Sequence, residues 1–337
     1  MMTESLPSKN PPQQATTLPL GRRLRHYLEA AGFFLVIGFF RLFDIDRASA
    51  IGAWIGRNLV APTPLSRRAV ANLRQAFPEK SEAEIHAIVV AMWDNLGRVM
   101  AEYPHLDEIH WRGPDPRIEL TGIENLEAGK ARGKGLIIMS GHFANWEIMP
   151  FVGHEYGFTG GVVVRPANNP YVNRWLDAVR TRNGMEEQIA KGPQGTRRAF
   201  SLLRRGEALL LLVDQRASEG IQVPFFGRDA FTTPAPAALA LKLGAVILPV
   251  SNQRLRGARF HMHVYPIIEL PNTGDAGKDL VELTATITRF IEERVRERPG
   301  GWLWIHKRWV DAKATLRKRA QALAIDNAAS EREPIDS

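Results

Sequence analysis

A histidine and a glutamate follow a short apolar run. The run GLIIMS (135–140) leads into Gly141 and His142, and Glu147 comes five positions after the histidine. Side chains five positions apart on a regular helix point about 140° apart, so the two meet only if His142 lies before the helix, on the turn that leaves the strand. A carboxylate bonded to one ring nitrogen would leave the other nitrogen free to take a proton. We therefore expect His142 to act as a general base that Glu147 orients; the alternative is a structural histidine.

The elements that must position this pair alternate along the chain. Helix-like segments near 171–183, 195–205 and 235–243 separate short aliphatic runs, which predicts an α/β fold with a mostly parallel central sheet flanked by helices. In such sheets ligands collect at the carboxyl ends of the strands, which is where His142 lies. The predicted strands are GLIIMS (135–140), GGVVVRP (160–166), ALLLLVD (208–214), GAVILPV (244–250) and RFHMHVYPIIEL (259–270).

The chain before the first strand has helical periodicity. Apolar residues recur at helical spacing over 65–76 and 82–103, and Ser81 with Glu84 forms a capping-box pattern at the start of the second helix. A long amphipathic helix is predicted over 279–297. The predicted organisation is a disordered lead-in (1–19), a membrane-anchoring helix with a helical segment (20–112), an α/β domain (113–312) that carries His142 and Glu147, and a C-terminal helix with a disordered tail (313–337).

The N-terminal apolar run predicts an anchor that enters one leaflet or lies in the interface. The run from Tyr27 to Phe43 makes roughly 25 Å of helix, against a bilayer core of ~30 Å, and arginines precede it. Those arginines would hold the preceding end on the cytoplasmic side. A buried core helix is an alternative. A cleaved signal peptide, suggested by Ala48-Ser49-Ala50, is disfavoured by the long stretch before the run and by the charged residues after it.

Composition bounds the chemistry. The 337 residues contain no cysteine, which excludes thiolate nucleophiles and thiolate metal sites, and 44 basic against 36 acidic residues give a net charge of +8 that favours an anionic partner. We predict no cofactor. His261 and His263 share one side of a strand, but no dense ligand spacing supports a metal site. Nucleic-acid binding is not expected, because no recognised motif is present.

Three further residues are candidates for substrate binding. Arg165 ends a strand, and a guanidinium suits a phosphate, although an ordinary ion pair is the alternative. Asp214 also ends a strand, where it would hold Arg165 in place or position a sugar. Asn168 either contacts ligand or, as we favour, shapes the turn around Pro170.

Several blocks resemble one family. Gly-His-Phe-Ala-Asn-Trp-Glu (141–147) looks like the His-x4-Asp/Glu motif of glycerolipid-type acyltransferases, and most closely that of the bacterial lipid A late acyltransferases. The departures are Ala144, where Gly is usual, and Gly300-Gly301, which replaces a more polar pair. The other matching blocks are Val164 to Pro170, Val213-Asp214-Gln215, Val223 to Gly227 with Thr233-Pro234, and Trp302 to Trp309.

The resemblance implies transfer of an acyl chain from acyl carrier protein to a hydroxyl of a phosphorylated lipid A precursor of the Kdo2-lipid IVA type. It implies a location at the cytoplasmic face of the bacterial inner membrane, in contact with its lipids. We expect backbone N–H groups near Gly141–Phe143 to stabilise the oxyanion. A Ser140 nucleophile is not expected, because no nucleophile elbow surrounds it. The alternatives are a glycerol-phosphate or lysophospholipid acyltransferase, and a non-catalytic lipid-binding protein attached to the membrane.

Overall fold

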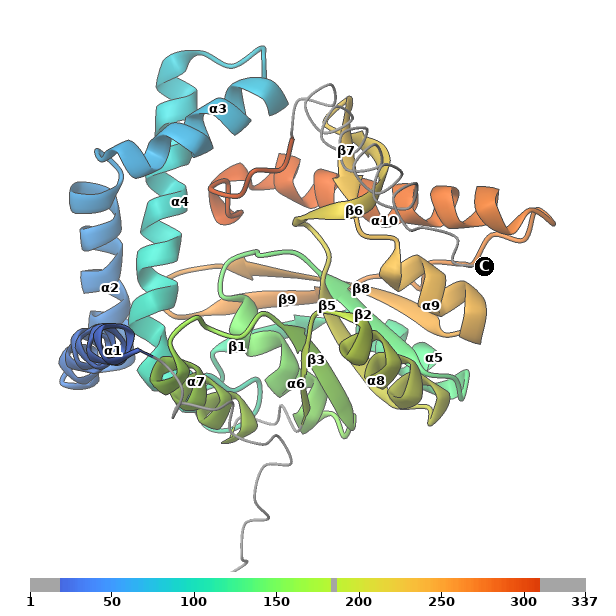
Figure 1. Cartoon of the computed structure of the whole chain (residues 1–337), viewed down its shortest axis with the longest axis horizontal. Helices are drawn as coiled ribbons and strands as arrows, with labels where there is room; N and C mark the ends of the chain where they lie inside the picture. Colours follow the sequence, from blue (N-terminus) through green and yellow to red (C-terminus); the bar gives the residue numbers. More distant parts are fainter. Residues whose placement is uncertain (1–18, 183–186, 310–337) are drawn as a thin grey trace, which may run out of the picture.

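A seven-stranded sheet forms the centre of the molecule (Figure 1). The computed structural model describes residues 19–182 and 187–309, so the predictions for the lead-in, Pro19 apart, and for the C-terminal helix and tail lie outside the described residues. The strand order is β1-β9-β8-β2-β5-β3-β4. These strands are β1 (Ile118–Thr121), β2 (Leu136–Ser140), β3 (Gly160–Val164), β4 (Glu187–Ala190), β5 (Ala208–Leu212), β8 (Val246–Arg254) and β9 (Phe260–Val264).

The predicted mostly parallel sheet flanked by helices is confirmed, with one exception. β8 and β9 pair antiparallel, whereas the other strand pairs of the sheet are parallel. The helices are α1 (Leu20–Arg41), α2 (Ile45–Ile55), α3 (Arg67–Ala76), α4 (Glu82–Glu102), α5 (Ile123–Ala131), α6 (Met149–Glu155), α7 (Pro170–Arg182), α8 (Pro193–Arg204), α9 (Ala235–Leu243) and α10 (Ala276–Glu297).

Each face of the sheet has its own core. Every residue of β2 is buried, because alternate side chains enter opposite cores. Ile137 and Met139 pack with residues from α4, α8, α9 and α10, and Leu136 and Ile138 pack with residues from α5, α6 and α7. The strands therefore read as continuous apolar runs, and their carboxyl ends are held at one edge.

The edge strands and a separate hairpin were not predicted. β1 and β4 lie at the two edges of the sheet, and each carries polar residues, such as Glu119 and Gln188, that obscure a strand pattern. The hairpin of β6 (Arg216–Phe225) and β7 (Arg228–Thr232) forms a second, two-stranded sheet. A Phe226-Gly227 turn joins its strands, with Phe226 at a φ of 54°.

The helices α2 and α4 cross closely beside the sheet (Figure 1). A Cβ atom built on Gly52 would lie 2.3 Å from the carbonyl oxygen of Gly97, and one on Gly97 would lie 2.0 Å from the carbonyl oxygen of Gly52. Only glycine permits this approach. The Ser81–Glu84 capping box predicted at the start of α4 is confirmed.

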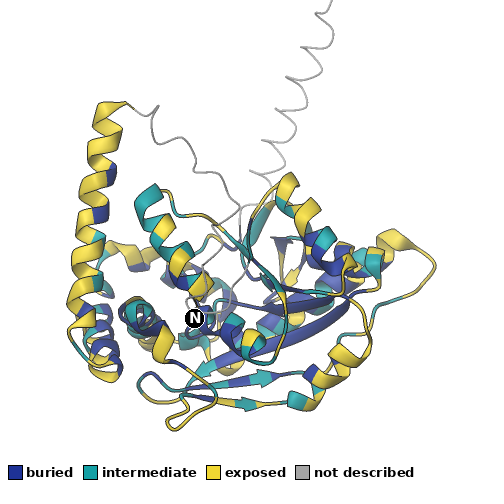
Figure 2. Ribbon diagram, turned by 90° about the horizontal axis from the view of Figure 1, so that it is seen from below, coloured by how far each residue is buried: buried dark blue, intermediate teal, exposed yellow. Residues whose placement is uncertain are grey.

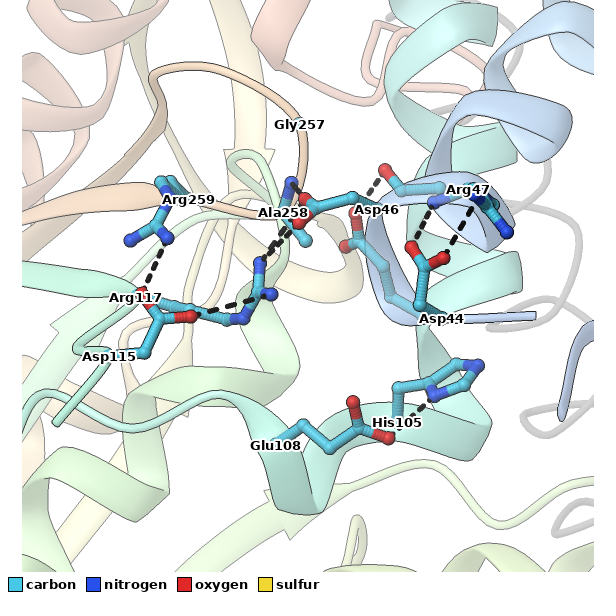
Figure 3. A network of polar contacts seen from close by, with 12 residues as sticks. Asp44, Asp46, Arg47, His105, Glu108, Asp115, Arg117, Gly257, Ala258 and Arg259 are labelled. Atoms are coloured by element: carbon cyan, nitrogen blue, oxygen red, sulfur yellow. Dashed lines mark hydrogen bonds and ion pairs between the residues drawn. The ribbon is translucent and has the colours of Figure 1, made fainter. Parts of the chain in front are cut away.

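A polar network ties the start of α2 to the sheet (Figure 3). Asp44 caps α2 by accepting a hydrogen bond from the Arg47 amide at 2.9 Å. Asp46 accepts hydrogen bonds from Arg117 just before β1 and from the Ala258 amide between β8 and β9. The N-terminal helices are thus fixed to the α/β part of the chain.

Helix α1 extends from the body with one side against it. The long helix at the left of Figure 2 is largely exposed, and Leu35 keeps 75% of its surface. The opposite side packs on α7, where the rings of Tyr27 and Tyr171 lie 4.9 Å apart and those of Phe33 and Trp175 lie 5.3 Å apart. The alternative of a buried core helix is therefore wrong. Within residues 19–182 and 187–309, none of the helices has the length and hydrophobicity needed to cross a bilayer.

Candidate active site

His142 lies on the turn between β2 and a 3-10 helix at Trp146–Ile148, as the residue spacing predicts. The turn is tight. A Cβ on Gly141 would lie 2.8 Å from the Phe143 ring, so glycine is needed for space rather than for an unusual φ angle. Ala144 has a φ of 46°, in the left-handed region that favours glycine. The glycine usual at this position would relieve that strain.

Asp214 holds His142 through two hydrogen bonds. The Nδ1 atom of His142 lies 2.8 Å from Oδ1 of Asp214, and the backbone N–H of His142 donates to Oδ2 at 2.7 Å. The indole N–H of Trp302 donates to the same Oδ2 at 2.7 Å. The carboxylate fixes the ring so that Nδ1 carries the proton and Nε2 is an acceptor.

Asp214 is ionised despite being buried. Burial alone would raise the pKa of its carboxyl group, but the neighbouring His142 charge and the hydrogen bonds from His142 and Trp302 outweigh burial and hold the pKa well below its usual range. An ionised carboxylate at this place stabilises an imidazolium on His142. Asp214 therefore has the position that we expected Glu147 to take.

The expectation that Glu147 orients His142 is corrected by the geometry. Arg180 donates two hydrogen bonds to the Glu147 carboxylate, at 2.7 and 2.9 Å, and the Tyr103 hydroxyl donates a third at 2.8 Å. Burial raises the pKa of Glu147, but Arg180 and the hydrogen bonds lower it below its usual value. The physical reason is that Glu147 is the middle residue of the 3-10 helix, where it contacts Tyr103, just after α4, and Arg180 of α7 instead of the turn.

The other ring nitrogen of His142 contacts an amide. Nε2 of His142 lies 3.1 Å from Nε2 of Gln215, which also lies 3.0 Å from Nε2 of His306. The two imidazole rings are 5.6 Å apart, and the His142 side chain is 14% exposed. Burial, followed by the His142 charge, lowers the pKa of His306, so its neutral form is favoured. One amide group thus connects the Nε2 atoms of two histidines.

The backbone N–H groups of His142, Phe143 and Ala144 already have partners, so two of the N–H groups that we expected to stabilise an oxyanion are occupied. The amide of His142 donates to Asp214, that of Phe143 donates to the Gly141 carbonyl at 2.8 Å, and that of Ala144 donates to the Gly301 carbonyl at 2.9 Å. Each N–H has an internal partner because the turn is tight. The side-chain amide of Gln215 is the polar donor closest to the base nitrogen among the contacts described above.

Ser140 is a structural residue. Its hydroxyl is buried and donates to the Val250 carbonyl at 2.6 Å, which links β2 to β8. The hydroxyl proton is therefore not directed toward His142. This arrangement agrees with the expectation that Ser140 is not a nucleophile.

The other predicted substrate residues are not gathered at His142. Arg165 is exposed just after β3 and has no hydrogen bond or ion pair with a described residue, so Asp214 does not hold it. Asn168 is also exposed. The turn role that we gave to Asn168 belongs to Asn169, whose Oδ1 accepts from the Tyr171 amide at 3.0 Å. The side-chain amide of Asn169 also donates to the backbone carbonyl of His26 in α1 at 2.8 Å.

The histidines of β9 do not form a metal site. His261 and His263 both contact the Thr121 hydroxyl, at 2.8 and 2.7 Å. No cluster of three or more potential metal ligands exists within the described part of the chain.

Asp214 was predicted as a site residue, and the sequence also contained a signal for its unpredicted grouping with His142 and Gln215. Asp214 and Gln215 follow β5 as His142 follows β2, and these two parallel strands are neighbours. The carboxyl ends of neighbouring parallel strands lie side by side, so the three residues could have been grouped. His306 and Trp302 belong to the block from Trp302 to Trp309, for which the resemblance alone gave a signal and the residue spacing gave none. The sequence did not indicate that Arg180 contacts Glu147, because Arg180 lies inside an amphipathic helix like other surface arginines.

Comparisons with known proteins identify the family of the chain. Residues 20–311 match the family described as bacterial lipid A biosynthesis acyltransferase. The chain is 26% identical to a lipid A biosynthesis acyltransferase of Haemophilus influenzae, over 81% of this chain and 84% of the relative. It is 27% identical to the lipid A biosynthesis lauroyltransferase of Escherichia coli, over 71% and 76%.

A related activity is also represented. A phosphatidylinositol mannoside acyltransferase of Mycobacterium tuberculosis is 24% identical, over 74% of this chain and 78% of the relative. The relatives named here are acyltransferases, and the family match covers the described α/β part together with the N-terminal helices. The chain is an acyltransferase and belongs to the bacterial lipid A biosynthesis acyltransferase family.

Proposed function

We propose that this enzyme transfers a fatty acyl chain from acyl carrier protein to a hydroxyl of a phosphorylated lipid A precursor, with His142 as general base and Asp214 as its positioning residue. One observation carries the proposal. In a chain of this family, the Nδ1 atom of His142 is held at 2.8 Å by a buried carboxylate, while Nε2 has the side-chain amide of Gln215 as its only hydrogen-bond partner among the described residues. This is the geometry that a base needs to take a proton from a weakly nucleophilic alcohol.

The reaction needs no covalent enzyme intermediate. The acceptor hydroxyl gives its proton to Nε2 of His142 as its oxygen attacks the thioester carbonyl carbon. The resulting oxyanion collapses, the carbon–sulfur bond breaks, and the imidazolium returns the proton to the departing thiolate. Asp214 stabilises the imidazolium during this cycle.

Gln215 has two roles in the proposal. Its amide occupies the position next to Nε2 of His142, so the acceptor hydroxyl replaces it there when substrate binds. His306 retains the amide through the second contact, at 3.0 Å. A donor held this close to the base is suited to the oxyanion, because the backbone N–H groups of the turn are occupied.

The acceptor would be reached from a membrane surface. Exposed leucines line one side of α1, and three arginines (Arg22, Arg23 and Arg25) lie near its start. Such a helix binds in the interface plane, with its basic end on anionic headgroups. We place the enzyme at the cytoplasmic face of the inner membrane, where Arg165 is a candidate contact for an acceptor phosphate.

The test is an acyl-transfer assay with purified protein. Acyl carrier protein and coenzyme A thioesters are each offered with a lipid A precursor, glycerol 3-phosphate and a lysophospholipid. We expect transfer from acyl carrier protein to the lipid A precursor. Preference for glycerol 3-phosphate or the lysophospholipid would favour the related acyltransferases, and binding without turnover would favour a non-catalytic lipid-binding protein.

The base is tested in the same assay. His142→Ala should lower kcat by ~10²–10⁴-fold, the usual range for a general base. His261→Ala, which removes a partly exposed histidine from β9, is the matched control and should keep full activity. Full activity of the folded His142→Ala protein would refute the mechanism.

A further inference from the structure

A cavity lies on the other side of the turn that carries His142. It has a volume of about 220 Å³, and Phe143 and Ala144 form one wall. A water molecule takes ~30 Å³ in the liquid, so the cavity holds a group several times larger than water. The remaining walls come from α4 (Ala91, Asp94 and Asn95), the end of β8 (Ser251 to Arg254), the end of α10 (Arg294 and Arg298) and Gly300-Gly301.

The cavity wall carries more positive than negative charge. Three arginines line it, against Asp94 as the acidic lining residue. Asp94 is already shared between two other arginines, Arg57 and Arg98, the second at 2.7 Å. The cavity therefore has cationic groups in excess of the carboxylates that neutralise them.

The three arginines differ in how many of their side-chain donors already have partners within the protein. The donors of Arg254 already have partners, because Arg254 pairs with the fully buried Glu102 and donates a hydrogen bond to Asn95 at 3.0 Å. Arg294 pairs with Glu297 at 2.7 Å, yet its Nε atom is buried without a partner. Arg298 is exposed and has no ion pair or hydrogen bond from its guanidinium to a described residue. The last two have donors to offer a ligand.

A buried polar network makes this wall rigid. Asn95 donates to the Ala144 carbonyl at 3.0 Å, and Asn252 donates to the Asn145 carbonyl at 2.7 Å. Because these amides hold the backbone just after His142, occupation of the cavity would be coupled to the catalytic turn.

We propose that this arginine-lined cavity binds a phosphate group carried by one of the two substrates. The inference rests on the proposed function, in which both the lipid acceptor and the phosphopantetheine arm of the carrier protein bear phosphate. Arg294 and Arg298 donate charge-assisted hydrogen bonds to its oxygens. Binding energy from this remote group helps to hold the reacting groups at His142.

Phosphate binding is measured first, without turnover. Inorganic phosphate is titrated into the full-length protein, and its Kd is followed by ³¹P NMR. Arg298→Ala and the double variant R294Q/R298A should bind at least about tenfold more weakly, as loss of a charged hydrogen bond predicts. Arg296→Ala removes the same charge from the same helix end, does not line the cavity, and should leave the Kd unchanged. Equal Kd values in all variants would overturn the proposal.

Steady-state kinetics then identify the source of the phosphate. If the acceptor supplies it, Arg298→Ala should raise KM about tenfold for the phosphorylated acceptor and leave KM for the dephosphorylated form unchanged. If the carrier protein supplies it, KM should rise for the acyl carrier protein thioester and not for the phosphate-free N-acetylcysteamine thioester. An unchanged KM for both substrates would refute a substrate phosphate here. Absence of transfer by the wild-type protein, with the Kd pattern intact, would instead refute the proposed function.

Discussion

Asp214 contacts His142 at two points, the ring Nδ1 at 2.8 Å and the backbone N–H at 2.7 Å. One carboxylate therefore sets both the tautomer of the ring and the path of the turn beneath it. Glu147, which stands in the His-x4-Glu motif, makes its own separate ion pair with Arg180 at 2.7 Å. The two carboxylates have different partners, and this separation allows their roles to be tested one at a time.

Asp214→Asn should remove most of the catalytic rate. The amide has no charge to stabilise the imidazolium, so we expect kcat to fall by ~10²–10⁴-fold while KM for the acceptor changes little. The measurement is a steady-state assay on protein whose folded fraction is known from circular dichroism. Glu147→Gln is the comparison. A larger kcat loss in fully folded Glu147→Gln than in Asp214→Asn would return the orienting role to Glu147.

The ion pair between Glu147 and Arg180 should contribute to stability. Both side chains are buried, at 6% and 11% exposure, so Arg180→Met leaves an unpaired carboxylate and should lower the free energy of unfolding by about 3–5 kcal/mol. The double variant E147L/R180M should recover much of this loss, because no charge is left without a partner. Denaturant unfolding in detergent measures both. Equal stability of Arg180→Met and the wild type would show that the pair is not stabilising.

The ion pair between Glu147 and Arg180 also predicts how the free energy of unfolding depends on pH. The pKa of Glu147 is lower in the folded protein than in the unfolded chain, where it is about 4.3. Its contribution to the free energy of unfolding is therefore fully present above pH 4.3 and is lost as the pH falls toward the folded-state pKa. The difference in unfolding free energy between wild type and Glu147→Gln should therefore be constant from pH 7 to about 5 and shrink below pH 4.3. A difference that grows as the pH falls would contradict the direction of the shift.

Ala144→Gly should stabilise the protein. Ala144 has a φ of 46°, where a Cβ atom is strained, so glycine should raise the free energy of unfolding by up to about 1 kcal/mol. Ala178→Gly, at an exposed position inside α7, is the control and should lower it by about 0.5–1 kcal/mol. Thermal unfolding measures whether each substitution raises or lowers the stability. A lower midpoint for Ala144→Gly would mean that the strain is absent.

The strands that lead to the site were predictable because both of their faces are buried. β2 and β5 are almost wholly aliphatic, and this pattern predicts that His142 and Asp214 lie at strand ends. β1 and β4 were missed, because a four-residue edge strand with polar side chains has little hydrophobic pattern. Sequence alone thus determined the centre of the sheet and not its edges.

The pairing of the side chains in the candidate site was less predictable. Spacing along the chain indicated that His142 could meet Glu147 only if it preceded a helix, yet it could not show that Asp214, 72 positions away, would be the residue that contacts it. The order of strands decides that proximity, since β5 lies directly beside β2. Arg180 was unpredictable for a similar reason, because its partner depends on how α7 packs across the sheet.

The last prediction concerns α1 and the membrane. Leu24, Leu28 and Leu35 share one side of the helix and are 58%, 66% and 75% exposed. The opposite side, with His26 and Ala30 buried, packs on the protein. Leucines on the free side are available to lipid, and burying one stabilises binding by ~1.5–3 kcal/mol. The triple variant L24Q/L28Q/L35Q should therefore bind anionic lipid vesicles at least about 100-fold more weakly, as measured by co-sedimentation.

A matched variant separates membrane binding from general loss of apolar surface. Leu255 and Val281 are 45% and 47% exposed, and they lie on the β8–β9 loop and on α10, outside α1. L255Q/V281Q should bind vesicles as the wild type does, and all three proteins should unfold at similar temperatures because the substituted side chains are exposed. Acyl transfer by L24Q/L28Q/L35Q should fall on vesicle-borne acceptor and persist on acceptor dispersed in detergent. Wild-type vesicle binding by that variant would show that α1 does not contact the lipid through its leucines.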